Sequence, residues 1–217
     1  MRIESIGVRT NNLENMREVL HELGNIMGCL QNREFILNNL RIGLQPESEE
    51  WIVKRDTDYE GIESYLYVFC RESENYFRTV KVGYHMLLDV GIEVNEAWKR
   101  AERNTFSDIH VEHIMTRMFG ISEEEAEIFG NPMYVLTNEK AFRGASVILH
   151  DDTLKKFRKK FQTEKIAIFP SSIHECIVIP YDGSISVEKM SDMVRSINET
   201  DVEEDEILSN RAYIVAI

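Results

Sequence analysis

The chain has 217 residues, of which 43% are hydrophobic and 29% are charged, and its formal net charge is −13. This composition excludes a disordered chain and predicts a soluble globular protein. The negative charge disfavours nucleic acid and anionic membranes as direct partners, because like charges repel. No apolar run is long enough to span a membrane, and the first residues contain no apolar signal region, so we expect a cytoplasmic protein. The three cysteines (Cys29, Cys70, Cys176) are far apart, which fits a reducing compartment.

The N-terminal part of the chain has a mixed pattern of helices and strands. Apolar residues at near-helical spacing predict a first helix, with Asn12 as its cap. Alternating aromatic and aliphatic residues predict a strand that ends at Cys70, and Gly120 is placed to stop a later helix. The predicted helices cover residues 12–30, Asn95–Asn104 and Ile109–Phe119, and the predicted strands cover Glu50–Lys54 and Ile62–Cys70.

A change in pattern near residue 130 predicts a boundary. Ser122 and Glu125 form a capping-box pattern, which predicts a short helix that ends by Gly130. The following Asn131-Pro132 breaks a helix, because proline disfavours the helical conformation of the residue before it. We therefore expect a mixed helix and strand part over residues 1–130 and an α+β subdomain over 131–217, packed together as one globular unit.

The C-terminal part alternates strand patterns with two helical patterns. The predicted elements are strands Met133–Thr137 and Ala145–His150, a helix Thr153–Phe161, strands Lys165–Phe169 and Glu175–Ile179, a helix Val187–Ile197 capped by Ser186, and a strand Ala212–Ile217. Pro170-Ser171-Ser172 predicts a hairpin turn. The order β-β-α-β-β-α-β predicts an α+β fold with a mainly antiparallel sheet. One core is expected to hold Leu154, Phe157, Phe169, Ile177, Ile179, Val194 and Ile197.

Three segments of this part resemble a known family. They read MYVLTNEKAFRGASVILH from Met133, FPSSIHECIVIP from Phe169 and MSDMVRSINETDVEEDEILSNRAYI from Met190. Residues 133–217 are thereby similar to an uncharacterised domain-of-unknown-function family from anaerobic Firmicutes and their mobile elements, whereas residues 1–130 match its pattern poorly. The resemblance implies a cytoplasmic bacterial or phage-encoded protein, and it implies no reaction.

The hairpin turn contains the candidate catalytic residues Ser171, Ser172, His174 and Glu175. A serine nucleophile with a histidine base would suit acyl transfer. However, His174 and Glu175 point to opposite faces of a strand, and no glycine-flanked serine elbow is present. We therefore favour a structural role, in which the serines bind turn amides and His174 fixes the hairpin. A hydrolase or metal-dependent enzyme that uses this hairpin is the alternative.

Two further clusters have competing interpretations. His110 and His113 are three residues apart, so on a helix they would share one side and could chelate a metal. They lack the HExxH pattern, and we expect neither a metal nor another cofactor. The basic run Lys155–Lys160 is interpreted as a solvated helix face that is balanced by Asp151, Asp152 and Glu164.

The most compact acidic run is the segment Glu203, Glu204, Asp205 and Glu206. It lacks the spaced ligands and central glycine of an EF-hand, so we interpret it as a solvated surface that can bind a partner. With no strong catalytic signature in the chain, we expect a non-enzymatic protein-interaction module. A specific form is a phage or mobile-element accessory protein that inhibits a host nuclease through an acidic surface. The oligomeric state stays open.

Overall fold

The computed structural model describes residue 21 and residues 23–73, 76–128 and 131–217. The chain forms two compact units. The first includes residues up to Ile42, Glu49–Arg55 and Tyr65–Thr105, and the second consists of Gly43–Ser48, Asp56–Ser64 and Phe106–Ile217. Both contain helices and antiparallel strand pairs, so the predicted α+β class is confirmed. The predicted boundary at residue 131 differs from this division, since the second unit already includes residues 106–130.

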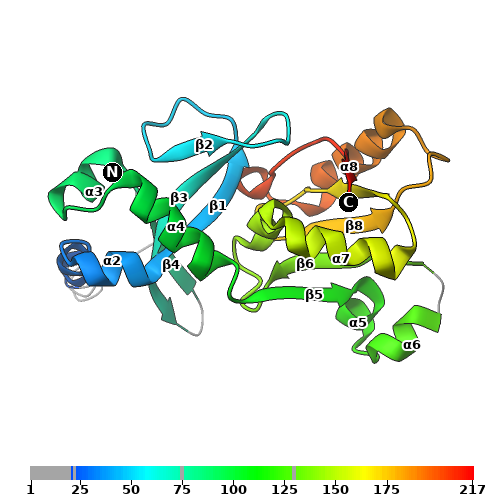
Figure 1. The fold of residues 1–217 in the computed structure, drawn as a ribbon, viewed down its shortest axis with the longest axis horizontal. Helices are drawn as coiled ribbons and strands as arrows, with labels where there is room; N and C mark the ends of the chain where they lie inside the picture. Colours follow the sequence, from blue (N-terminus) through cyan, green and yellow to red (C-terminus); the bar gives the residue numbers. More distant parts are fainter. Residues whose placement is uncertain (1–20, 22, 74–75, 129–130) are drawn as a thin grey trace, which may run out of the picture. The chain divides into compact units, whose positions relative to one another are not determined.

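The first unit contains most of a four-stranded sheet and the helices α2, α3 and α4 (Figure 1). Its strands β1, β3 and β2 are neighbours in that order, and β4 pairs antiparallel with β3. Residues 23–29 are helical, whereas the rest of the helix predicted over 12–30, including its Asn12 cap, lies largely outside the described residues. The elements are α2 (Arg33–Asn39), β1 (Leu40–Pro46), β2 (Lys54–Asp56), β3 (Ile62–Ser73), β4 (Tyr76–Lys81), α3 (Tyr84–Asp89) and α4 (Val94–Thr105).

Two of the predicted elements in this unit are confirmed and one is wrong. The strand over Ile62–Cys70 and the helix over Asn95–Asn104 correspond to β3 and α4. The strand predicted over Glu50–Lys54 is wrong, because regular pairing begins only at Lys54. Helix α4 buries Ala97, Trp98 and Ala101 on one face, as its apolar spacing requires.

The second unit is built on a five-stranded sheet in the order β5-β6-β8-β7-β9, and all four pairings are antiparallel. The predicted strands at Met133, Lys165, Glu175 and Ala212 are confirmed to within one residue at their starts. The helix capped by Ser186 is also confirmed. The elements are β5 (Ile109–His113), α5 (Ile114–Phe119), α6 (Glu123–Ile128), β6 (Tyr134–Asn138), η1 (Gly144–Leu149), α7 (Asp151–Phe161), β7 (Lys165–Phe169), β8 (Cys176–Pro180), α8 (Val187–Asp201), η2 (Glu204–Glu206) and β9 (Tyr213–Ala216).

Two predicted elements of this unit are wrong in type. The helix predicted over Ile109–Phe119 is a strand, β5, in its first half, and only α5 is helical. The strand predicted over Ala145–His150 is the 3-10 helix η1. Residues 144–148 are buried throughout, and a short continuous apolar run does not distinguish a strand from a buried helical segment.

Alternate residues of the sheet face two different cores. Leu154 and Phe157 of α7 pack with Ile166 and Val178 on one face. On the other face, Met190 and Val194 of α8 pack with Ala167, Phe169 and Ile179. The prediction of a single core is therefore wrong, because successive strand residues point to opposite faces.

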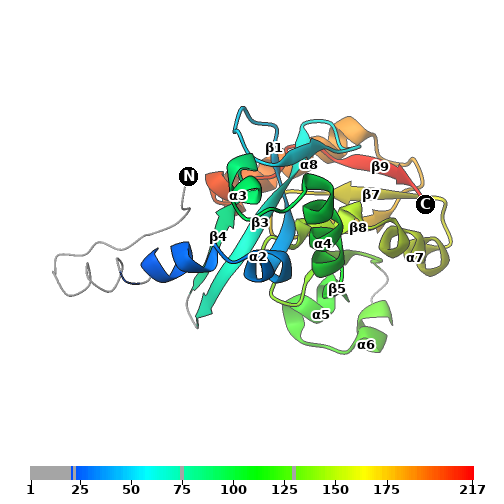
Figure 2. The same cartoon turned by 60° about the vertical axis from the view of Figure 1, so that its left-hand side comes forward.

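Helices α7 and α8 thus cover opposite faces of the five-stranded sheet, which can be followed in Figures 1 and 2. Ile197, which was expected in the core, lies on the outer side of α8 and is 47% exposed. In the part of the chain that the structure describes, every helix is too short or too polar to span a lipid bilayer.

Candidate functional site

The turn between β7 and β8 is held between two other loops of the second unit. On one side, the Ile173 N–H donates to the Glu206 carbonyl at 2.9 Å, and the Leu208 N–H donates to the Ser171 carbonyl at 3.0 Å. On the other side, the Gly144 N–H and the Thr137 hydroxyl both donate to the His174 carbonyl, at 2.9 and 2.8 Å. The turn is therefore fixed by hydrogen bonds to segments far away in the sequence.

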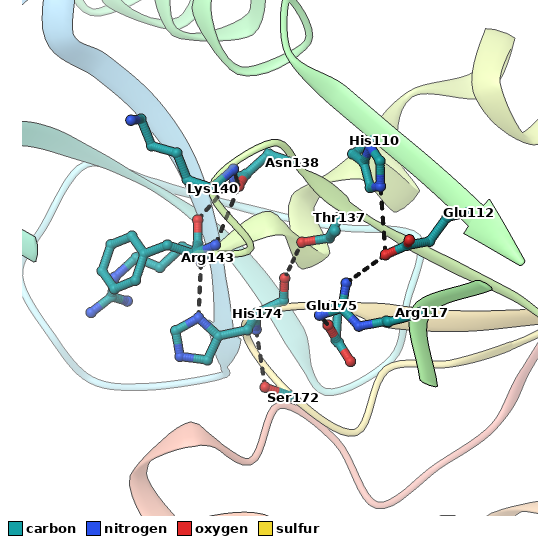
Figure 3. Close-up of polar contacts among 11 residues, drawn as sticks. His110, Glu112, Arg117, Thr137, Asn138, Lys140, Arg143, Ser172, His174 and Glu175 are labelled. Atoms are coloured by element: carbon teal, nitrogen blue, oxygen red, sulfur yellow. Dashed lines mark hydrogen bonds and ion pairs between the residues drawn. The ribbon is translucent and has the colours of Figure 1, made fainter. Parts of the chain in front are cut away.

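The imidazole of His174 is held at both ring nitrogens. Its Nδ1 accepts a hydrogen bond from the Arg143 N–H at 3.0 Å (Figure 3). Its Nε2 lies 3.3 Å from Oε1 of Glu206. Because Nδ1 is an acceptor, these partners assign the neutral tautomer with its proton on Nε2, where it is donated to Glu206. The ring also packs against Phe142, with centroids 5.4 Å apart.

The loop that supplies Arg143 is tightly wound. The Asn138 side chain accepts from the N–H groups of Lys140 and Phe142, at 3.1 and 3.2 Å, and donates to the Phe142 carbonyl at 2.8 Å. Ala141 and Arg143 have φ angles of 48° and 51°, which non-glycine residues rarely adopt. Strained residues of this kind persist only where surrounding contacts fix them, and the bond to His174 is one such contact.

The four candidate catalytic residues do not form a nucleophile with its base. The Ser172 hydroxyl accepts from the His174 N–H at 3.1 Å, and the His174 ring is bonded to Arg143 and Glu206 instead of a serine. Glu175 forms an ion pair with Arg117 (Figure 3). A catalytic histidine in a serine triad bonds the serine with one nitrogen and the acid with the other, and His174 lacks the first of these bonds.

His110 and His113 lie on a strand, so a separation of three residues places them on opposite faces of β5. His110 Nε2 is 3.5 Å from Glu112, which also pairs with Arg117 at 2.8 Å. His113 is buried, lies 2.9 Å from the Asn131 carbonyl through Nε2, and accepts from the Met115 N–H, so it caps α5. The structure therefore does not bring these two imidazoles together. Among the described residues, no group of three or more His, Cys, Asp and Glu side chains is arranged to hold a metal ion.

The acidic run lies beside the histidine turn. Glu203, Glu204 and Asp205 are exposed, and Glu206 is the residue that pairs with His174. The sequence pattern assigns His174 to a candidate catalytic hairpin and Glu206 to a candidate partner-binding run, whereas in the structure the two side chains contact each other. No sequence signal could have shown this pairing, because it depends on how the 206–208 segment crosses the turn.

A pocket of about 440 Å³ lies near the other end of the sheet and was not predicted. Lys160 Nζ pairs with Glu127 at 2.8 Å and lies 4.4 Å from the centre of the Tyr134 ring. The hydrogen bond from Lys160 lowers the pKa of Glu127, while burial raises the pKa of Tyr134. The pocket therefore offers hydrogen bonds and aromatic walls rather than a net charge. Its lining residues are His113, Glu127, Asn131, Pro132, Tyr134, Lys160 and Phe161.

The basic run of α7 is balanced by neighbouring acids, as predicted. Lys155 lies 3.8 Å from Asp151 and 3.9 Å from Asp152, and Arg158 pairs with Glu164 at 2.7 Å. The polar face of α7 is therefore the ordinary solvated face of an amphipathic helix.

The second unit therefore has an α+β fold, in which an antiparallel sheet lies between two helices. The chain belongs to the DUF5688 family, a family of unknown function, which matches residues 57–215. The match begins well before residue 133, so the expectation of a poor match over residues 1–130 is wrong for residues 57–130. No curated protein matches the chain, and no solved structure matches it.

The role of His174 can be tested by substitution. His174→Ala removes the acceptor of the Arg143 N–H and the partner of Glu206, so we expect a loss of about 1–3 kcal/mol in the free energy of unfolding. His174→Asn, which can present an acceptor near the position of Nδ1, should recover part of that loss. Urea denaturation followed by circular dichroism measures both. An alanine variant as stable as the wild type, but defective in a measured activity, would contradict the structural role.

Proposed function

We propose that this protein is a non-enzymatic interaction module that binds a basic protein through the acidic turn Glu203–Glu206. The observation that supports this most is that the acidic turn is bonded to the neighbouring histidine turn. Its last residue is tied to the histidine turn by the Ile173–Glu206 backbone bond and the His174–Glu206 contact. Glu203, Glu204 and Asp205 have no ion pair within the described parts of the chain. Their charges are thus available on a preorganised support, which reduces the entropic cost of binding.

The net charge of −13 favours a basic partner. An acidic surface attracts such a partner over a distance of about a Debye length and increases its association rate. Nucleases carry basic surfaces that bind the phosphate backbone, so a host nuclease is the class of partner that this surface would compete for. A cytoplasmic accessory protein of a phage or mobile element is the biological form of this proposal.

The alternative, a hydrolase or metal-dependent enzyme built on Ser171, Ser172, His174 and Glu175, receives less support. A general base needs a ring nitrogen that can reach the nucleophile's proton. In His174 both nitrogens already have partners, and neither partner is a serine.

Charge reversal tests the proposed function. We expect the triple variant Glu203→Lys, Glu204→Lys and Asp205→Lys to bind a captured basic partner about tenfold more weakly, mainly through slower association. Glu206 is left unchanged because it holds His174. The partner is captured from a bacterial host lysate, identified and purified, and its association rate is measured at several salt concentrations. The wild-type rate should fall steeply with salt, because steering is screened over about 8 Å at physiological ionic strength.

The matched control changes the net charge equally at exposed acids elsewhere, with Glu49→Lys, Glu102→Lys and Glu124→Lys. It should bind almost as well as the wild type. Equal loss of binding in both triple variants would mean that only the overall charge matters. Capture of the same proteins by wild type and by the Glu203–Asp205 variant, or of none by either, would refute the proposed surface.

A further inference from the structure

The outer edge of the five-stranded sheet is β5, and its register with β6 shows which backbone groups face outward. His110 lies opposite Thr137 and Glu112 lies opposite Val135. The same register continues beyond the strand in two hydrogen bonds, from the Ile114 N–H to the Met133 carbonyl and from the Glu139 N–H to the Asp108 carbonyl. In an antiparallel pair, hydrogen-bonded and non-bonded positions alternate. The even-numbered residues of β5 therefore bond to β6, and Ile109, Val111 and His113 direct their N–H and C=O groups away from it.

Two of these three outward positions are open. The His113 N–H is bonded to the Glu123 carboxylate at 2.8 Å. In the described parts of the chain, the backbone groups of Ile109 and Val111 have no hydrogen-bond partner. Val111 as a whole residue is 38% exposed, so this stretch of edge is accessible. Natural sheets protect such an edge with charged side chains, proline, a bulge or a short strand. The five-residue strand Ile-His-Val-Glu-His contains no lysine or proline, its one acid is Glu112, and its ladder with β6 is regular.

We propose that this edge pairs with β5 of a second copy of the chain, antiparallel about a two-fold axis at Val111. In this register, each Val111 exchanges two backbone hydrogen bonds with the partner's Val111. His110 then lies directly opposite the partner's Glu112, and Glu112 lies opposite the partner's His110. Such non-bonded positions bring side chains closest together, so each imidazole can donate a hydrogen bond to the carboxylate opposite it and stabilise the pairing.

The charges also select this register over its neighbour. A shift that pairs Ile109 with the partner's Val111 would use the open backbone groups of both residues. It would, however, place the Asp108 carboxylate against the partner's Glu112 carboxylate on both sides of the axis, and like charges directly opposite destabilise a sheet. The strand is thus self-complementary in one antiparallel register, which favours a second copy over an unrelated strand.

Exposed apolar side chains adjoin this edge. Met118 and Phe119 of α5 and Ile128 of α6 are all exposed, and both helices pack beside β5 in the second unit (Figure 1). Large exposed apolar side chains on elements next to an open strand edge are typical of an interaction surface. A two-fold pairing of β5 would add these helices to the contact on both sides of the new ladder.

The test is the oligomeric state of the full chain, measured by sedimentation equilibrium over a range of concentrations at physiological ionic strength. The two copies each carry a charge of −13, and under these conditions their repulsion is screened beyond about 8 Å. We expect the wild type to pass from monomer to dimer as its concentration rises. Val111→Pro should remain monomeric, because it removes the outward N–H. Proline is tolerated at an edge position whose N–H is not in the ladder, so the fold should persist, as circular dichroism would confirm.

His110→Glu provides an independent variant that leaves the backbone unchanged. It turns two symmetry-related attractive pairs into repulsive ones, so we expect dimerisation to weaken about tenfold. Val111→Thr keeps the strand propensity and the backbone N–H, and should dimerise like the wild type. A wild type that stays monomeric at all concentrations, or a dimer that neither Val111→Pro nor His110→Glu weakens, overturns the proposal. Binding of another protein at this edge by a monomeric wild type would overturn it as well.

Discussion

Replacing Phe157 with alanine is expected to reduce the free energy of unfolding by about 3–5 kcal/mol. Phe157 is only 3% exposed and lies in the core between α7 and the sheet. Its ring stacks on Phe161, with centroids 5.0 Å apart, and meets Tyr134 at 5.7 Å. Truncation therefore removes buried apolar surface and leaves a cavity that the aromatic neighbours fill only in part.

Urea denaturation followed by circular dichroism measures this loss. Ile197→Ala is the matched control, because Ile197 is also apolar but lies on the exposed side of α8. It should change stability by less than about half a kcal/mol. Similar losses in the two variants would mean that the assignment of buried and exposed helix faces is wrong.

The second large effect is expected at Gly144, where Ala should cost about 3 kcal/mol or more. A Cβ at this position would lie 2.3 Å from the Thr137 hydroxyl oxygen, 2.6 Å from the Asn138 nitrogen and 2.8 Å from the His174 carbonyl oxygen. Two of these atoms belong to the backbone and cannot rotate away. The substitution should therefore separate the η1 loop from the histidine turn and lower the melting temperature strongly.

Gly28→Ala serves as the control for Gly144→Ala. Gly28 lies in the helical residues 23–29 and is exposed, and a Cβ added to it would meet no heavy atom within 4 Å. Alanine there should be neutral or stabilising by up to about 1 kcal/mol, because glycine is a poor helix former. A Gly144→Ala variant as stable as Gly28→Ala would show that the close contact is relieved at little cost.

The elements with strong local signals could be predicted from the sequence. The Pro170 turn separates two β-branched runs, and Ser186 precedes an amphipathic helix, so the predicted starts of β7, β8 and α8 are accurate. Local signals are absent where the prediction is wrong. The short segment Ile109–His113 suits either a helix or a strand, and its pairing with β6 decides in favour of the strand.

The candidate site could be predicted only as a set of residue types. The sequence indicates the turn at Ser171–His174 and predicts that His174 bonds a neighbouring loop. The identity of that loop depends on the conformation of η1, for which the sequence predicts a strand. It also depends on residues 206–208, which form backbone hydrogen bonds with the turn. The separation of His110 from His113 likewise depends on the strand geometry of β5. Side-chain partners that come from distant segments carry no local signature.

The second unit is assembled from three separate stretches of the chain, and this limits how it can be inherited. Tyr59 belongs to the middle stretch, yet it is buried in the core beside α7, where its hydroxyl donates to the Ile148 carbonyl at 3.0 Å. Leu44 and Ile62 join the same core. A gene fragment that began at Phe106 would encode the five strands without these three side chains. A fragment that carries the whole unit must therefore begin at or before Gly43, and it also carries Glu49–Arg55 and Tyr65–Thr105 of the first unit.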